Sequence, residues 1–339
     1  MQVAARMREP LARVVGWMLA GLSGAVAAVP VALPVDFSCD RFFVTPTTAG
    51  GETLRLYTDT GGGLWLAESA VNRLQLDVVS LRDGDREMRL AAFPAFAPGQ
   101  GIPALDPDTD RRDGPAKGRL YVLPPDPRVN FGDGMLGQDW FGGRRWTFDY
   151  AQGRLLADAA PIDASAPHSV PLGFPVDEDG QRKTHFPSIV ARVDGVELPF
   201  LFDTGATISA SADAAKAIGV GSPGDCATSF IVASLFDAWR KAHPDWRVVE
   251  NADLRGGATK GEAMIEVPQM EIAGHRVGPV WFTRRADSNF HEYMSGFMDR
   301  KVDGALGGSL LRWFVVDVDY PAARARFTLI EGPRPAPVR

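Results

Sequence analysis

The chain has 339 residues, of which 45% are hydrophobic and 23% charged, ordinary proportions for a globular protein long enough for about two domains. Its 36 basic and 42 acidic side chains give a net charge of −6 without the basic patch or stripe of a nucleic-acid-binding protein. These features exclude a disordered chain and predict no nucleic-acid partner, and the 36 glycines and 26 prolines favour many turns and short strands.

The first residues have the pattern of an export signal. Three arginines among the first 13 residues precede an apolar stretch over residues 14–29, which ends in Ala25-Val26-Ala27. Small residues at this spacing are typical of a signal-peptide cleavage site. The stretch is shorter than the roughly 20 apolar residues that a spanning helix needs. We therefore expect a signal peptide at 1–28 and an exported protein, periplasmic or secreted, with no membrane span after its removal.

The elements of the first half lead to an aspartate. Apolar runs at 41–44 and 53–58 flank the turn Ala49-Gly50-Gly51 and predict a hairpin that ends directly at Asp59-Thr60-Gly61. A short helical pattern follows at 68–74.

The second half repeats this order more clearly. Apolar runs at 185–193 and 196–202 flank Asp194-Gly195, which is a strong hairpin signal, and lead into Asp203-Thr204-Gly205. A helix is expected at 212–218, because Ser211 is a good N-cap and Gly219 lies where helices commonly end.

The two halves are copies of one unit. The Asp-Thr-Gly triplets are 144 positions apart, whereas the segments 133–137 (Asp-Gly-Met-Leu-Gly) and 303–307 (Asp-Gly-Ala-Leu-Gly) are 170 apart, so the second copy carries 26 extra residues. After these segments the copies stay in step, through Asp149-Tyr150 and Asp319-Tyr320. The predicted organisation is an N-terminal lobe at 29–160, a linker at 161–170, a C-terminal lobe at 171–332 and a tail at 333–339.

Two Asp-Thr-Gly turns, each followed by a hydrophobic-Leu-Gly segment and a strand ending near Asp-Tyr, resemble the aspartic peptidases. The segments 201–207 (Leu-Phe-Asp-Thr-Gly-Ala-Thr) and 306–311 (Leu-Gly-Gly-Ser-Leu-Leu) are closest to the retropepsin-like bacterial branch. The resemblance covers most of residues 37–332. It implies a mainly β, two-lobed acid-peptidase fold with a few short helices and an active site between the lobes, in a protein of the bacterial cell envelope.

The chemistry explains why two copies are needed. Two carboxyl groups about 3 Å apart share one proton, so the ionised member can activate a water and the protonated member can polarise a peptide carbonyl. The resemblance assigns these catalytic roles to Asp59 and Asp203. It implies that Thr60 and Thr204 lock the turns together, and that Gly61 and Gly205 leave room beside the carboxylates. The predicted function is an aspartic-type endopeptidase, a monomer that acts on peptides or proteins without a cofactor or metal.

Three residues depart from the family pattern. Gly62 and Ala206 stand where pepsin-like enzymes have a hydroxyl that donates to the aspartate, and Thr58 replaces a large apolar residue. The missing donors predict an activity optimum above that of the gastric enzymes. The departures also leave open a catalytically weak or inactive binding or scaffold protein of the envelope. A second alternative is a homodimer in which Asp203 pairs with its copy.

Other segments have less specific patterns. Glycine-rich residues 255–261 precede an apolar strand, which makes Gly256, Gly257 and Thr259 flap candidates, and 97–101 is a weaker candidate in the first lobe. An ordinary hairpin loop is the alternative for both. Residues 229–242 have a helical pattern that is expected to pack on the second lobe, with a partner-binding helix as the alternative.

The cysteines and histidines give no metal site. His291-Glu292 lacks the second histidine of a zinc-peptidase motif. Cys39 and Cys226 show no paired metal-binding spacing, and either a disulfide or two separate buried thiols fits the sequence.

Overall fold

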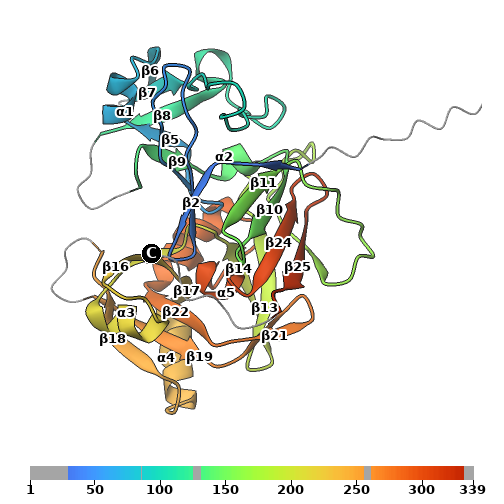
Figure 1. Cartoon of the computed structure of the whole chain (residues 1–339). Helices are drawn as coiled ribbons and strands as arrows, with labels where there is room; N and C mark the ends of the chain where they lie inside the picture. Colours follow the sequence, from blue (N-terminus) through green and yellow to red (C-terminus); the bar gives the residue numbers. More distant parts are fainter. Residues whose placement is uncertain (1–29, 85, 125–130, 256–260, 332–339) are drawn as a thin grey trace, which may run out of the picture.

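The computed structural model describes residues 30–84, 86–124, 131–255 and 261–331. The predicted signal peptide at 1–28 therefore lies outside the described residues. Figure 1 shows two lobes, one from the N-terminal half (blue to cyan) and one from the C-terminal half (yellow to orange), with a further sheet beside their junction. No helix in the described part of the chain is long and apolar enough to cross a membrane. The chain is mainly β and two-lobed with a few short helices, as expected.

The sheet of the first lobe contains both halves of the predicted hairpin. Residues Phe43 and Tyr57 pair in register, so the strands expected around the Ala49-Gly50-Gly51 turn are antiparallel neighbours. Among the described residues, the strands of this lobe-one sheet are, in spatial order, β2 (Val35–Ser38), β3 (Arg41–Val44), β4 (Leu56–Thr58), β9 (Gly134–Leu136), β5 (Trp65–Ala67), β8 (Arg119–Leu123), β7 (Arg86–Ala92) and β6 (Val78–Asp83).

The sheet of the second lobe is larger. Asp194 and Gly195 both have positive φ, of 51° and 76°, and join strands that pair at Val193 and Val196, as the Asp-Gly signal predicts. In spatial order, the described strands of this lobe-two sheet are β16 (Gly224–Ala227), β15 (Thr207–Ala210), β18 (Val248–Asp253), β19 (Glu262–Val267), β22 (Val280–Arg285), β17 (Ser229–Val232), β23 (Gly304–Leu306), β14 (Val196–Phe202), β13 (Ser188–Val193), β20 (Met270–Ile272) and β21 (His275–Val277).

A central sheet joins the lobes and displays the duplication directly. Thr147 of one copy pairs with Asp317 of the other, which are 170 positions apart, the same offset as the Leu-Gly segments. Ser169 and Val170, placed in the predicted linker, belong to a strand of this sheet. Its described strands are, in spatial order, β1 (Val31–Ala32), β11 (Arg154–Ala157), β10 (Arg145–Asp149), β24 (Phe314–Asp319), β25 (Arg324–Leu329) and β12 (Ser169–Pro171).

Most expected helices form. The helix expected at 212–218 forms as α3 (Ala212–Ile218). It is capped as predicted, because the Ser211 side chain accepts a hydrogen bond from Ala214 N and Gly219 has a φ of 82°. The described α-helices are α1 (Glu68–Arg73), α2 (Gln138–Phe141), α3 (Ala212–Ile218), α4 (Ala233–Ala242) and α5 (Gly308–Leu311), with a 3-10 turn at Gly114–Ala116 and further helical turns at Asn289–Tyr293 and Met294–Phe297.

The prediction of a helix at 229–242 is wrong for its first part. Residues 229–232 form strand β17 in the interior of the lobe-two sheet, and only α4 is helical. The apolar run of β17 is buried between β22 and β23, so sheet pairing prevails over the helical spacing of Ile231 and Leu235. Trp239 of α4 packs on Phe282 of β22, with ring centroids 5.4 Å apart, so the helix packs on its own lobe as expected.

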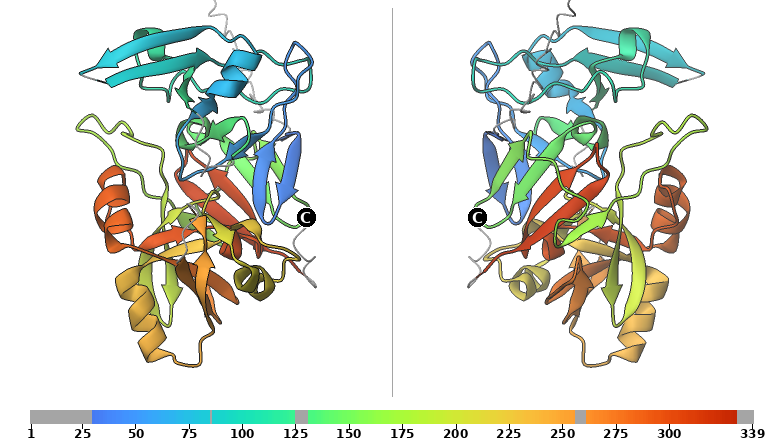
Figure 2. Two further views of the ribbon diagram at one scale, coloured as in Figure 1. Left: turned by 90° about the vertical axis from the view of Figure 1, so that its left-hand side faces the viewer. Right: turned by 90° about the vertical axis from the view of Figure 1, so that its right-hand side faces the viewer.

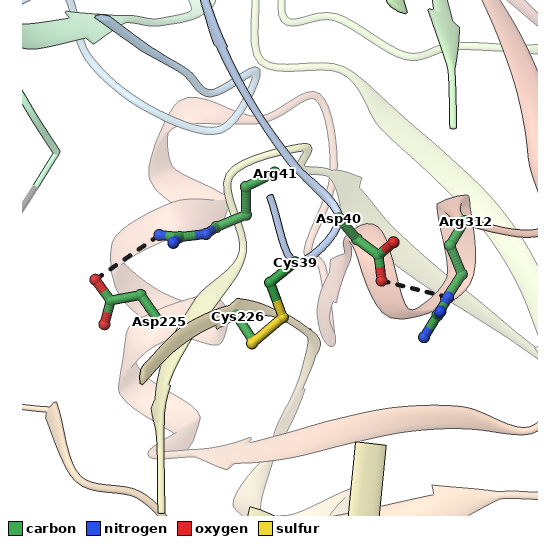
Figure 3. Close-up of a disulfide and its surroundings, with 6 residues drawn as sticks. All are labelled: Cys39, Asp40, Arg41, Asp225, Cys226 and Arg312. Atoms are coloured by element: carbon green, nitrogen blue, oxygen red, sulfur yellow. Dashed lines mark ion pairs between the residues drawn. A yellow bond between two sulfur atoms is a disulfide. The ribbon is translucent and has the colours of Figure 1, made fainter. Parts of the chain in front are cut away.

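A disulfide between Cys39 and Cys226 joins the lobes, which settles the question that the sequence left open. Figure 3 shows it beside two ion pairs across the same junction. Asp40 lies 3.3 Å from Arg312, and Arg41 lies 3.7 Å from Asp225. The β2–β3 turn of the first lobe is therefore fastened to the second lobe by covalent, ionic and hydrogen bonds, the last from the amide of Ala227 to the carbonyl of Cys39.

Candidate active site

The two Asp-Thr-Gly turns begin where buried parallel strand pairs end. Strand β4 runs parallel to β9, and β14 runs parallel to β23. The amide of Asp59 donates to the carbonyl of Leu136 at 3.1 Å, and the amide of Asp203 donates to that of Leu306 at 3.0 Å. Each Leu-Gly segment therefore fixes the backbone of one aspartate, which explains why the two motifs recur together in both copies.

The two threonines bind the turns to each other across the lobe junction. The amide of Thr60 donates to Thr204 Oγ1 at 3.2 Å, and the amide of Thr204 donates to Thr60 Oγ1 at 3.0 Å. Thr60 Oγ1 in turn donates to the carbonyl of Phe202 at 2.8 Å. Both threonines are fully buried. This reciprocal arrangement is the lock that the resemblance implies for Thr60 and Thr204.

The carboxyl groups of Asp59 and Asp203 meet at this lock. They lie close enough for each to shift the pKa of the other, and each residue is only 8% exposed. The amide of Gly61 donates to Asp59 Oδ1 at 2.9 Å, and the amide of Gly205 donates to Asp203 Oδ1 at the same distance. The predicted pair therefore forms within one chain.

Glycine is required on both sides because each turn presses against the opposite carboxyl group. A Cβ added at Gly61 would lie 2.6 Å from Asp203 Cγ, and one added at Gly205 would lie 2.0 Å from Asp59 Cγ. Real Cβ atoms do not approach other atoms so closely. Gly61 and Gly205 thus leave the space that the sequence analysis assigned to them.

Burial makes ionisation of the pair costly. Burial raises the pKa of Asp59 well above its ordinary value, and the charge of Asp203 raises it further. Burial also raises the pKa of Asp203, although the hydrogen bond from Asp59, the amides of Gly205 and Ala206 and the Arg255 guanidinium oppose that rise. The two carboxyl groups titrate as one coupled pair, so the shared proton belongs to the pair and either member can carry the negative charge.

The departures from the family pattern have local explanations. The Thr58 hydroxyl donates to the carbonyl of Phe42 at 2.9 Å, so this polar side chain is satisfied where an apolar one is expected. A side chain at Gly62 would press on its neighbours, because an added Cβ would lie 2.6 Å from both Asp59 Cγ and the sulfur of Met135. Ala206 is 1% exposed and lies against Gly307.

The flap candidates are only partly described. Gly256, Gly257 and Thr259 lie outside the described residues, between strands β18 and β19, which pair at Asp253 and Glu262. Residues 97–101 form a turn bonded to Thr47, and the long hairpin of the first lobe is β6–β7 instead. Figure 2 shows this hairpin (cyan) extending past the rest of the lobe.

Sequence reasoning missed three residues beside the dyad. Tyr57 lies two positions before Asp59, and its hydroxyl contacts Thr207 Oγ1 at 2.7 Å and the carbonyl of Gly205 at 3.0 Å. Arg255 donates to the carbonyl of Thr207 and has no ion-pair partner in the described part of the chain. Thr207 ends the segment 201–207 and Arg255 begins the glycine-rich segment 255–261, but the sequence assigned neither a role beside the dyad, and the contacts of Tyr57 exist only because the lobes meet.

The described residues contain no cluster of three or more histidine, cysteine, aspartate or glutamate side chains suited to a metal ion. His291, the histidine of the incomplete zinc motif, has its Nε2 2.9 Å from Asp303. That contact joins the helical turn Asn289–Tyr293 to the residue directly before β23.

Comparison with known proteins finds similarity among solved structures only. No protein family and no curated protein matches the chain. Among solved structures, an aspartic proteinase from Irpex lacteus is similar at 12% identity, with a TM-score of 0.48, over 89% of this chain and 97% of the other. A likeness this low carries no argument about activity, so the functional interpretation rests on the geometry of Asp59 and Asp203.

Proposed function

We propose that the chain is an aspartic-type endopeptidase that uses Asp59 and Asp203. The observation that carries the proposal is that these two buried carboxyl groups meet at one site, each against the Asp-Thr-Gly turn of the other lobe. Thr60 and Thr204 lock these turns reciprocally. Such a pair is suited to holding one proton between two carboxylates.

The proposed reaction proceeds without a covalent intermediate. The ionised member of the pair takes a proton from a water as the water oxygen attacks the peptide carbonyl carbon, while the O–H of the protonated member donates to the carbonyl oxygen. The tetrahedral intermediate then collapses, the carbon–nitrogen bond breaks, and the leaving nitrogen receives a proton from the pair. The amides of Gly61 and Gly205 support a charge on either member, because each donates to one of the two carboxyl groups at 2.9 Å.

The geometry bears on both alternatives. The symmetric homodimer needs Asp203 to face its own copy, but Asp203 already pairs with Asp59 in the same chain. The binding or scaffold protein was suggested by Thr58 and Gly62. The hydroxyl of Thr58 is satisfied internally, and a side chain at Gly62 would displace the Asp59 carboxyl group or the Met135 side chain. Neither residue therefore speaks against catalysis.

The remaining parts of the proposal concern the branch of the family and the cellular location. We place the chain in the retropepsin-like bacterial branch, as an exported monomer of the periplasm or the medium that acts on peptides or proteins. The Cys39–Cys226 disulfide supports export, because disulfides persist in oxidising compartments.

Peptide cleavage tests the proposal. The purified protein is incubated with a diverse peptide mixture at roughly pH 3 to 7, with and without a statine-type inhibitor, and new termini are identified by mass spectrometry. We expect internal cleavage that the inhibitor blocks. Absence of new termini across this range, or cleavage that the inhibitor does not affect, would contradict the proposed function.

A further inference from the structure

Arg255 is linked to the Asp203 turn by a short chain of contacts. The amide of Gly205 donates to Asp203 Oδ1 at 2.9 Å, and Thr207 Oγ1 lies 3.0 Å from the carbonyl oxygen of Gly205. The Arg255 guanidinium donates to the carbonyl of Thr207. The hydroxyl of Tyr57, from the first lobe, contacts Thr207 Oγ1 at 2.7 Å. The guanidinium is therefore held beside the dyad, where the two lobes meet.

The backbone explains why an arginine side chain reaches this carbonyl. Strand β18 lies beside β15, and just after β18 the amide of Leu254 donates to the carbonyl of Ser209 at 2.8 Å. Nearer the dyad along β15, the Arg255 guanidinium supplies the donor for Thr207. The side chain is thus anchored through one nitrogen, while the residue as a whole is exposed.

The guanidinium of Arg255 has no ion-pair partner in the described part of the chain. The neighbouring carboxylate of Asp253 is already occupied. Its Oδ1 accepts the amides of Ser209 and Arg255, at 2.9 and 3.0 Å, and its Oδ2 accepts the Arg285 guanidinium at 2.6 Å. A guanidinium carries several N–H donors in a planar fork. The donors of Arg255 that do not reach Thr207 are therefore available to a ligand.

Arg41 adds a second positive charge to this side of the lobe junction. Its guanidinium lies 5.9 Å from the centroid of the Tyr57 ring and 3.7 Å from Asp225, the pair shown in Figure 3. Arg41 is only 6% exposed, and its Nε and Nη1 have no hydrogen-bond partner in the described part of the chain. A poorly compensated buried cation beside an exposed one makes the local potential favourable for an anion.

The corresponding side of the first lobe is apolar. Met135 lies beside Asp59, since a Cβ added at Gly62 would be 2.6 Å from both the Met135 sulfur and Asp59 Cγ. Trp65 pairs in register with Met135 on the neighbouring strand. The two sides of the dyad therefore offer a substrate different chemistry, apolar in the first lobe and cationic in the second.

We propose that Arg255 is a specificity-determining residue that binds the carboxylate of an aspartate or glutamate side chain of the peptide substrate, on the second-lobe side of the dyad. The inference rests on the proposed function, because it concerns the substrate of that site. A planar carboxylate matches the donors of a guanidinium. The C-terminal carboxylate of a peptide has the same chemistry, so the test must separate the two sources.

The test compares peptides that differ by one charge. In a fluorogenic peptide that the wild type cleaves, each residue flanking the scissile bond is replaced in turn by glutamate or by the uncharged glutamine. Every peptide is made with a free and with an amidated C terminus. The kcat/KM for the glutamate peptide is divided by that for the glutamine peptide in the same enzyme, which cancels any general effect of a variant on the dyad.

Three variants change the charge of Arg255 in steps. Arg255→Lys keeps the charge without the planar fork, Arg255→Gln removes it and Arg255→Glu reverses it. The matched control is Arg192→Gln, which removes an exposed arginine that pairs with Glu197.

We expect one position at which the wild type prefers glutamate about five-fold, mainly through KM, because the contact lies away from the reacting atoms. Arg255→Gln should abolish this preference, and Arg255→Glu should replace it by a preference for lysine. Arg255→Lys should keep part of it, and Arg192→Gln all of it.

The preference should depend on pH and on salt. It should disappear below about pH 4, where the glutamate of the peptide is protonated, and shrink at high salt. The charged groups around Arg255, which are the dyad and Arg41, Asp253 and Arg285, meet both peptides alike. Their own titration therefore leaves the ratio of the two kcat/KM values unchanged.

No preference for glutamate at any position, or an equal preference in Arg255→Gln, would overturn the inference. A preference that follows the free C terminus and is lost on amidation would overturn the assignment to a side chain. Arg255 is exposed, so its variants should fold, and Arg255→Gln carries the test should Arg255→Glu not fold.

Binding separates this inference from the proposed function. Fluorescence anisotropy with labelled statine peptides that carry glutamate or glutamine needs no turnover. Tighter binding of the glutamate peptide by the wild type than by Arg255→Gln, without cleavage of any peptide, sinks the proposed function alone. Cleavage of peptides with no Arg255-dependent preference sinks the inference alone.

Discussion

The backbone of Gly62 approaches Asp59 so closely that an added Cβ would lie 2.6 Å from Asp59 Cγ. From the sequence, Gly62 is a residue that lacks a hydroxyl donor, and a serine there would restore one. In the structure a side chain at this position would have to displace the Asp59 carboxyl group or the Met135 side chain. Gly62 therefore sets the position of the Asp59 carboxyl group instead of withholding a hydrogen bond from it.

Gly62→Ala should lower turnover by about ten-fold or more, because the new methyl group must displace the Asp59 carboxyl or the Met135 side chain. Gly63→Ala is the matched control, since an added Cβ at Gly63 meets no atom within 4 Å. Steady-state kinetics on one fluorogenic peptide compares the two. Equal activity of both variants would show that the carboxyl group can move aside without cost.

Arg255 should set the pH range of the pair. Its positive charge opposes the rise in the pKa of both Asp59 and Asp203, so Arg255→Gln should move both limbs of the pH–rate profile to higher pH. Arg192→Gln, which removes an exposed charge at a distant ion pair, is the control. Arg255 is exposed, so high salt should shrink the difference. A profile that stays in place, or moves to lower pH, contradicts this role.

The buried pair should make folding less stable as the pH rises. Its carboxyl groups have raised pKa values in the folded state, so their favourable contribution is present below the ordinary aspartate pKa of about 3.9 and is lost as they ionise. Asp59→Asn cannot ionise, and its Tm should exceed that of the wild type at neutral pH.

The Tm difference between Asp59→Asn and the wild type should disappear below about pH 4, where the wild-type pair is neutral. Asp245→Asn, at an exposed aspartate, supplies the control and should show no such difference. Thermal melts over a pH series measure the effect. A wild type more stable than Asp59→Asn at neutral pH would mean that the charged pair is well solvated.

The Cys39–Cys226 disulfide should contribute substantially to stability, because it closes a loop across 187 positions and joins the lobes. Replacing both cysteines by serine should cost about 3–5 kcal/mol in the free energy of unfolding. Denaturant unfolding of the variant, and of the wild type with and without reductant, checks this. If the loss does not occur, Asp40–Arg312 and the other contacts of the β2–β3 turn suffice to hold the lobes.

Local patterns predicted the framework of the site well. The Asp194-Gly195 hairpin and the Ser211-capped helix depend on neighbouring residues, and both form as expected. The repeat of Asp-Thr-Gly and Leu-Gly segments identified the strand ends that meet. Duplication made this possible, because two weak motifs in equivalent places support each other.

Contacts between residues far apart in the chain could not be predicted from the sequence. Tyr57 and Thr207 are 150 positions apart, and their hydrogen bond follows only from the docking of the lobes. The pairing of Cys39 with Cys226 stayed open for the same reason, since it needs a Cα separation that only the fold fixes, here 5.0 Å. The helix prediction was wrong around Ile231 because apolar residues at helical spacing can also form an interior strand.

The most direct test of the central claim is the turnover of Asp59→Asn and Asp203→Asn on a peptide that the wild type cleaves. Each variant should lose at least about a hundred-fold in kcat while remaining folded, because each carboxyl group performs a proton transfer that an amide cannot. Wild-type turnover in folded Asp59→Asn would contradict the intrachain pair of Asp59 and Asp203 and leave Asp203 to act without it.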